Sequence, residues 1–135
     1  MVLDELVRGK DIDFTKNVIG AHQIAQVEEW LGICLGDELE EYILKYGYLG
    51  YEDVELYGIN SRQFEKSDMI TQTEYLHKYF NKTMNYIGLE NIGDGIYILI
   101  DAQDNIYNYD SETDDLISLN LKLFEYILKR FTSVG

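Results

Sequence analysis

Cys34, His22 and His77 carry the most reactive side chains of this sequence. A cysteine nucleophile needs a neighbouring base, and a zinc site needs about four cysteine, histidine or carboxylate ligands. The sequence places neither histidine beside Cys34, which follows Ile33 and precedes Leu35. A cysteine between two apolar residues is typical of a small buried side chain. We therefore predict a buried Cys34, two surface histidines and no zinc site.

Residues 101–112 have the spacing of a calcium-binding loop. Side chains with oxygen ligands occupy positions 1, 3, 5, 7, 9 and 12 of that loop, namely Asp101, Gln103, Asn105, Tyr107, Tyr109 and Glu112. However, Ile106 stands where the loop requires glycine for a sharp turn, and residues 105–109 alternate like a strand although such a loop is flanked by helices. The segment therefore predicts a hairpin turn with surface acids, and we expect no metal and no cofactor.

Sequence motifs of known enzyme classes are missing. The sequence contains no glycine-rich phosphate-binding motif, no G-x-S-x-G nucleophile and no H-E-x-x-H metal motif. Its 25 acidic residues give many chance pairs of carboxylates, so no pair by itself indicates acid–base catalysis. We expect a protein that acts by binding and is not an enzyme.

The charge of the chain is strongly and unevenly negative. The 25 acids against 11 basic residues give a net charge of −14. Residues 28–60 carry nine acids and one lysine, and residues 83–120 carry eight acids and no lysine or arginine. Surfaces that bind nucleic acid or anionic lipid need lysine and arginine to face phosphates. The charge therefore argues against both partners and predicts a basic protein partner.

The sequence shows no segment that would carry the chain into or across a membrane. Its apolar runs, such as residues 96–100, are far shorter than the ~20 residues that span a bilayer. The first residues lack the basic and then apolar pattern of a secretory signal. We expect a cytoplasmic protein with no membrane partner.

Tyrosines and acids occur together in the first acidic segment, around the glycine-flanked residues 47–50. Buried aromatic side chains supply most of the binding energy of an interface, whereas carboxylates at its rim steer a basic partner. Our first prediction for the binding surface is Glu40, Glu41, Tyr48, Tyr51, Glu52, Asp53 and Glu55. The second is the set of acids Asp94, Asp104, Asp110, Glu112, Asp114 and Asp115.

The elements that must position these residues follow from hydrophobic periodicity and turn residues. Residues 1–135 are expected to form one α+β domain, a single antiparallel sheet with helices packed against it. The 3.6-residue period predicts helices at about 20–31, 37–46, 68–80 and 121–131. Alternation and turn signals predict strands at about 54–59, 85–90, 95–101 and 105–109. The predicted core includes Trp30, Leu31, Leu35, Leu39, Ile43, Ile98, Phe124, Ile127 and Leu128.

Four segments of the sequence carry a recognisable series of motifs. The segment 27–47 contains Glu28, Leu31-Gly32, Leu35 and Tyr46-Gly47, and it is followed by the segments 54–59, 93–107 and 123–128. In order and spacing these segments resemble the opening, the first strand, the glycine-rich hairpin and the closing helix of the SUKH superfamily of Smi/Knr-type immunity proteins. One residue departs from the pattern, because Gly36 replaces the proline that begins the second helix. Glycine can serve there as an N-cap.

The resemblance covers about residues 20–131 and implies a small bacterial protein that acts in the cytoplasm. Such a protein neutralises a cognate toxin by binding it, often a nuclease of a contact-dependent or polymorphic system. The acidic surface fits this role, since a nuclease presents a basic groove. Two other readings stay open at this point: an inhibitor of the DNA-mimic or anti-restriction type, and an intracellular scaffold or regulatory binding protein.

Overall fold

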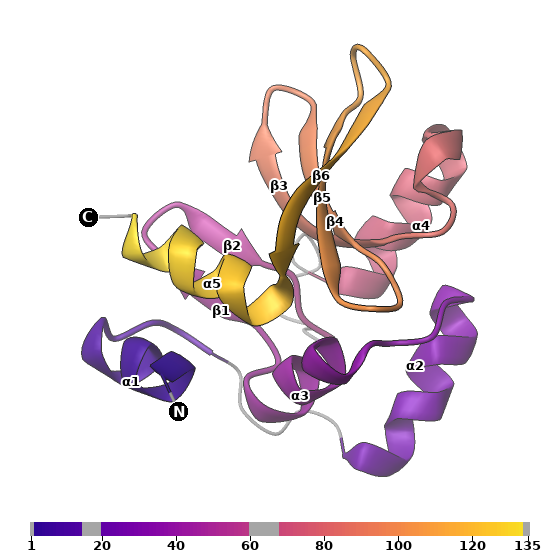
Figure 1. The fold of residues 1–135 in the computed structure, drawn as a ribbon. Helices are drawn as coiled ribbons and strands as arrows, with labels where there is room; N and C mark the ends of the chain where they lie inside the picture. Colours follow the sequence, from indigo (N-terminus) through magenta and orange to yellow (C-terminus); the bar gives the residue numbers. More distant parts are fainter. Residues whose placement is uncertain (1, 15–19, 60–67, 134–135) are drawn as a thin grey trace.

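Five α-helices, two short 3₁₀ helices and six strands make up the part of the chain that the computed structural model describes, residues 2–14, 20–59 and 68–133 (Figure 1). The helices are α1 (Val2–Gly9), η1 (Ala21–Gln23), α2 (Ile24–Leu31), α3 (Asp37–Lys45), α4 (Met69–Tyr79), η3 (Asn81–Thr83) and α5 (Leu123–Thr132). The strands are β1 (Leu49–Tyr51), β2 (Val54–Leu56), β3 (Ile87–Gly93), β4 (Ile96–Ile100), β5 (Asn105–Asp110) and β6 (Asp115–Lys122).

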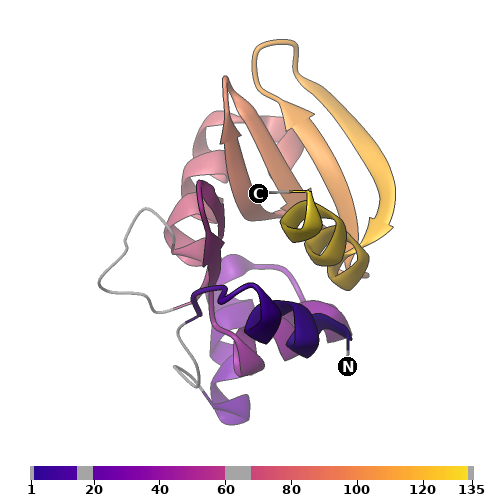
Figure 2. The ribbon, with the colours of Figure 1, turned by 90° about the vertical axis from the view of Figure 1, so that its left-hand side faces the viewer.

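Strands β3 to β6 form an antiparallel meander in which each strand pairs with the next. Figure 2 shows this sheet between α5 on one side and α4 on the other. The face toward α5 carries Ile98, which belongs to the same buried cluster as Ile127. The opposite face carries Leu99 and Tyr109, which pack with Leu76 of α4. The sheet therefore separates a large core from a smaller, tyrosine-rich one.

Strands β1 and β2 form a separate hairpin, so the prediction of a single sheet is wrong although the α+β class is confirmed. The Tyr57 N–H donates to the Leu89 carbonyl of β3 at 2.8 Å. The next residue, Gly58, pairs instead with Asp68, and its carbonyl accepts from the Met69 N–H. Because the backbone of Gly58 pairs with residues 68 and 69, the pairing with β3 does not continue into a ladder.

The predicted helices all form, with their ends shifted by a few residues, and so do strands β3, β4 and β5. The predicted strand 54–59 is shorter and is β2. Helix α1 and strands β1 and β6 were not among the predicted elements. None of the helices in the described ranges is long and apolar enough to cross a membrane.

Burial confirms most of the predicted core. Leu31, Leu39, Ile43, Ile98 and Ile127 are buried. Three predicted core residues are half-buried against it, Leu35, Phe124 and Leu128.

The predictions of a buried Trp30 and a buried Cys34 are wrong. Trp30 is 58% exposed, and Cys34 is exposed. Ile24 and Val27 take the buried face of α2, and Trp30 lies beside that face. Gly32 then ends the helix in the left-handed conformation, φ 71°, before the chain reaches Cys34.

Candidate partner-binding surface

The β1–β2 hairpin holds the tyrosines of the first predicted surface, and neither is a free anchor. Tyr48 is buried, and its hydroxyl donates to the Glu55 carboxylate at 2.6 Å. Burial, reinforced by that bond, raises the pKa of Tyr48. Tyr51 is half-buried, and the Lys10 Nζ lies 5.2 Å from the centre of its ring. Both tyrosines were predicted to anchor a partner, and in the structure their side chains already contact other parts of this protein.

The acids of the first predicted surface divide between two elements. Glu41 is exposed and Glu40 half-buried on α3, whereas Glu52 and Asp53 are exposed in the turn between β1 and β2. Figures 1 and 2 both show that this turn lies near the C-terminal end of α5. The structure therefore does not gather these carboxylates and tyrosines into one patch.

Asp104 was predicted as part of the second surface but is not available there, because it is only 5% exposed and caps a helix. Its two carboxylate oxygens accept hydrogen bonds from the backbone N–H groups of Glu38 and Leu39 at 2.9 and 3.0 Å, at the start of α3. A Cβ on Gly36 would overlap this carboxylate. The glycine that departs from the family pattern therefore makes room for a cap supplied by the β4–β5 turn.

The other five acids of the second predicted surface gather at one end of the four-stranded sheet. They lie in and beside the β3–β4 and β5–β6 turns, which Figure 1 shows at the same end of the sheet. The Ser111 N–H donates to the Gly95 carbonyl at 2.9 Å and joins the two turns. We call this group the acidic sheet end, and its members are Asp94, Asp110, Glu112, Asp114 and Asp115.

A group of aromatic side chains from α4, its C-terminal end and the sheet adjoins the acidic sheet end. Tyr75 and Tyr79 are 44% and 58% exposed, and their ring centres are 4.9 Å apart. The Phe80 ring lies 6.0 Å from Tyr97 and 5.7 Å from Tyr109, which is buried. These five residues, which we call the tyrosine face, combine two exposed rings, two half-buried rings and the buried ring of Tyr109.

A hydrogen bond connects the tyrosine face with the acidic sheet end. The Tyr109 hydroxyl donates to the Asp114 carboxylate at 2.5 Å. Burial, followed by this bond, raises the pKa of Tyr109 to about 12. Lys82, just after α4, donates to the Asp114 carbonyl at 2.7 Å. The combination of aromatic and acidic side chains predicted near the first hairpin thus occurs at the far end of the meander.

Sequence reasoning missed Tyr75 and Tyr79 as surface residues. Their spacing of four on a helix was a usable signal, because residues four apart lie on one face, while Leu76 points to the core. The predicted helix 68–80 used Tyr79 as part of its apolar stripe instead. Phe80 and Tyr97 join them only through the tertiary packing of α4 on the sheet.

The residues with apparent metal or nucleophile chemistry are not brought together. Asp101 accepts hydrogen bonds from the backbone N–H groups of Gln103 and Asn105, both at 2.9 Å, inside a hairpin turn as predicted. Burial opposes ionisation of Asp101, but these two bonds, together with those from the Asn105 amide and the Tyr107 hydroxyl, lower its pKa. His22 is exposed, and His77 is half-buried with Nε2 2.7 Å from the Tyr86 carbonyl, so it is not the surface residue that was predicted. The described residues contain no group of three or more metal-ligating side chains.

Comparison with known families gives one match and one negative result. Residues 4–131 match the SUKH family model described as SMI1-KNR4 cell-wall. No curated protein matches the chain. The match includes α1, which lies before the segments that carry the resemblance in the sequence, and extends to α5. Because the model covers nearly the whole chain, this protein belongs to the SUKH family.

Proposed function

We propose that this protein is an immunity protein that binds and neutralises a cognate bacterial toxin, a nuclease of a polymorphic or contact-dependent system. Membership of the SUKH family is consistent with an immunity role. The observation that carries the proposal is the acidic sheet end lying beside the tyrosine face. In this proposal the protein acts by binding the toxin and not by catalysis.

The two parts of this surface have different tasks in binding. A nuclease must hold a phosphate backbone and therefore presents lysine and arginine in its groove. Carboxylates on two adjoining turns attract such a groove from a distance and speed association. Tyr79 and Tyr75 supply broad rings that lose little conformational entropy on contact, and such rings are enriched among residues that dominate binding energy. The acids thus speed association with the toxin, and the tyrosines slow its dissociation.

Coexpression tests the biological role. The C-terminal toxin domain encoded by the neighbouring gene is expressed in a bacterial host with or without this protein, and growth is measured. We expect growth to be rescued by the wild-type protein. An expressed, folded protein that gives no rescue contradicts the proposal. An inhibitor of the anti-restriction type would instead reduce cleavage by a host restriction enzyme in the absence of that toxin.

Paired charge reversals test the surface. The variant Glu112→Lys with Asp115→Lys changes the acidic sheet end, and Glu41→Lys with Asp53→Lys makes the same change of charge elsewhere on exposed residues. Association with the toxin domain is measured at low and high salt. We expect the first variant to associate about tenfold more slowly at low salt and the second to change little. If only the second variant associates more slowly, the acidic sheet end is not the surface that binds the toxin.

Truncation of a ring tests the anchor separately. Because Tyr79 is exposed in the free protein, Tyr79→Ala leaves the fold largely unchanged. We expect it to weaken toxin binding by about 2 kcal/mol, mainly through faster dissociation. Binding at wild-type affinity excludes the tyrosine face from the interface.

A further inference from the structure

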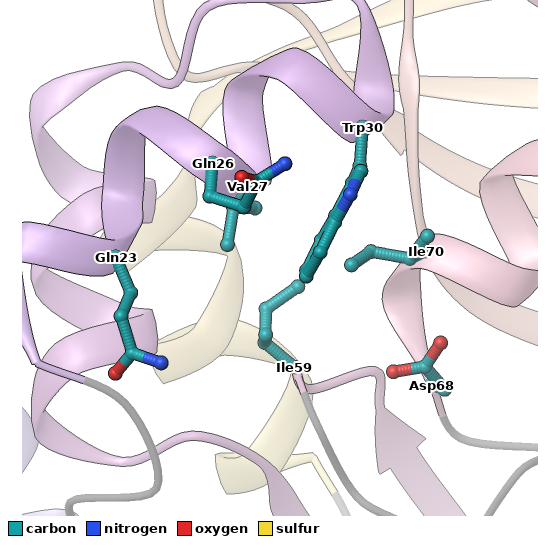
Figure 3. A pocket seen from close by; sticks show the side chains of 7 residues that line it. All are labelled: Gln23, Gln26, Val27, Trp30, Ile59, Asp68 and Ile70. Atoms are coloured by element: carbon teal, nitrogen blue, oxygen red, sulfur yellow. The ribbon is translucent and has the colours of Figure 1, made fainter.

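Trp30, the single tryptophan of the chain, borders a pocket that lies apart from the acidic sheet end. The pocket has a volume of about 310 Å³ and lies between α2 and the start of α4 (Figure 3). Figure 3 shows the indole ring standing between Val27 of its own helix and Ile70 of α4, with its far end beside Ile59. The ring is 58% exposed, so its surface is open to a ligand.

The pocket combines apolar walls with one carboxylate. Ile59, Ile70 and Val27 supply the walls, and Asp68 supplies the charge. Asp68 caps α4 through Oδ2, which accepts from the Thr71 N–H at 2.9 Å and from its hydroxyl at 2.8 Å. Within the described residues, Oδ1 accepts no hydrogen bond, and Figure 3 shows a carboxylate oxygen of Asp68 directed toward the pocket.

The electrostatic surroundings of the indole favour a cation. Trp30 lies in the last turn of α2, where the partial negative charge of the helix C-terminus is found. Helix α2 carries Glu28 and Glu29 and no basic residue. A tryptophan ring is the aromatic surface that attracts cations most strongly. The indole ring, the C-terminal end of α2 and the Asp68 carboxylate thus all attract a cation to the pocket.

We propose that this pocket binds an arginine side chain of a polypeptide partner. The planar guanidinium stacks on the Trp30 indole and donates to the Asp68 carboxylate, while its aliphatic stem packs against Ile59 and Ile70. The volume lies at the lower limit of the roughly 300–1,000 Å³ of small-molecule sites, which suits one side chain rather than an extended cofactor. This site is independent of the proposed toxin neutralisation.

The indole N–H signal in a nitrogen-15 NMR spectrum gives a direct readout, since the chain has a single tryptophan. The uniformly labelled protein is titrated with the capped peptide Gly-Gly-Arg-Gly-Gly. The control peptide carries citrulline, which keeps the shape of arginine but has no charge. We expect a saturable shift of the indole signal with the arginine peptide and at least about fivefold weaker binding of the citrulline peptide.

Two substitutions connect this binding to the pocket. Asp68→Asn removes the charge but keeps a good helix cap, and Trp30→Leu keeps an apolar side chain without a π surface. We expect each to weaken the arginine peptide about fivefold, followed through the Ile70 and Thr71 amide signals. Asp53→Asn, which removes one exposed carboxylate of the β1–β2 turn, is expected to have no effect.

Three results would overturn the proposal. The first is equal binding of the two peptides, and the second is unchanged binding by the Asp68 and Trp30 variants. The third is an equal loss of affinity in Asp53→Asn and Asp68→Asn, which would mean general attraction to an acidic protein. None of these measurements uses the toxin domain, so they can fail while toxin neutralisation stands.

Discussion

Gly36 and Asp104 show how a single missing Cβ determines a helix start. Serine is ordinarily as good an N-cap as any residue and better than glycine. In this protein a side chain at position 36 would displace the Asp104 carboxylate from the N–H groups of Glu38 and Leu39. We therefore expect Gly36→Ser to destabilise the protein by about 1–2 kcal/mol, measured by urea unfolding.

The same substitution should reverse its sign when Asp104 is removed. In the background of Asp104→Ala, the serine hydroxyl has room to cap α3, and Gly36→Ser should recover about 1 kcal/mol. Gly9→Ser is the matched control, because a Cβ there meets no atom within 4 Å. If Gly36→Ser destabilises both backgrounds equally, Asp104 is not the reason for the glycine.

Sequence reasoning predicted the role of Gly36 but not its partner. A glycine before the acidic first turn of 37–46 indicates an N-cap from local pattern alone. Asp104 lies 66 residues after Glu38, from whose N–H it accepts a hydrogen bond, and resembles any other surface acid of the meander in the sequence. Its burial depends on the packing of the β4–β5 turn against the start of α3. Local sequence spacing does not predict a tertiary contact of this kind.

At the scale of elements, a buried ion pair fastens α5 to β3. The Glu90 side chain is 2% exposed, and the Arg130 guanidinium donates to it through Nε and Nη2, the latter at 2.8 Å. The Tyr126 hydroxyl donates to the other carboxylate oxygen. Arg130→Met would leave a buried carboxylate without its cation. We expect a loss of about 3–5 kcal/mol in the free energy of unfolding, measured with denaturant.

A double variant separates lost charge pairing from lost packing. Glu90→Gln removes the charge that Arg130→Met leaves uncompensated, so the pair of changes should cost clearly less than the sum of the single ones. Lys129→Met, on an exposed neighbour in α5, is the control and should change stability by less than about 0.5 kcal/mol. Strict additivity of the two changes would show that the ion pair contributes no coupling energy.

The elements predicted from sequence are those whose pattern is local. Helices α2, α3, α4 and α5 carry clear 3.6-residue periods. Strand β6 was missed because its pairing with β5 shifts register between Asn105 and Tyr107, and Asn120 takes a positive φ of 57°. This irregularity breaks the alternation along residues 115–122. Strand β1 is three residues long and was interpreted as a loop.

The positions of the acids and tyrosines relative to one another were less predictable than the fold, for a related reason. Charge segments along the chain do not indicate which acids share a surface. Tyr48 lies beside acids in sequence and is buried. Tyr79 is distant from Asp114 in sequence but belongs to the tyrosine face, which the hydrogen bond from Tyr109 joins to Asp114. Only the packing of α4 on the meander brings the second pair of residues together.

At the scale of the whole molecule, the tyrosines make stability sensitive to alkaline pH. Eight of the twelve tyrosines have raised pKa values, mainly through burial, namely Tyr42, Tyr46, Tyr48, Tyr57, Tyr97, Tyr107, Tyr109 and Tyr126. In Tyr107 the hydrogen bond to Asp101 contributes more than burial. These hydroxyls lose their protons more readily in the unfolded chain, where the pKa is about 10. Their contribution is complete below that value and is lost as the pH rises through the folded-state pKa values.

We therefore expect the melting temperature to fall steeply above pH ~10, whereas below that value these tyrosines should cause no change of stability with pH. Tyr109→Phe removes one such group, whose folded-state pKa is about 12, and should make the decline between pH 10 and 12 shallower. Thermal unfolding is measured across this range beside phenolate absorbance. Ionisation of all tyrosines near pH 10 in a protein that stays folded would contradict this expectation.

The cap that reaches α3 from 66 residues downstream also imposes an order on synthesis. A nine-residue helix is too short to be stable alone, and its first N–H groups have no carboxylate until Asp104 leaves the ribosome. At about 5–20 residues per second, this interval lasts roughly 3–13 s. During that time the start of α3 lacks its carboxylate cap. The start of α3 is therefore completed late in translation, when the β4–β5 turn supplies Asp104.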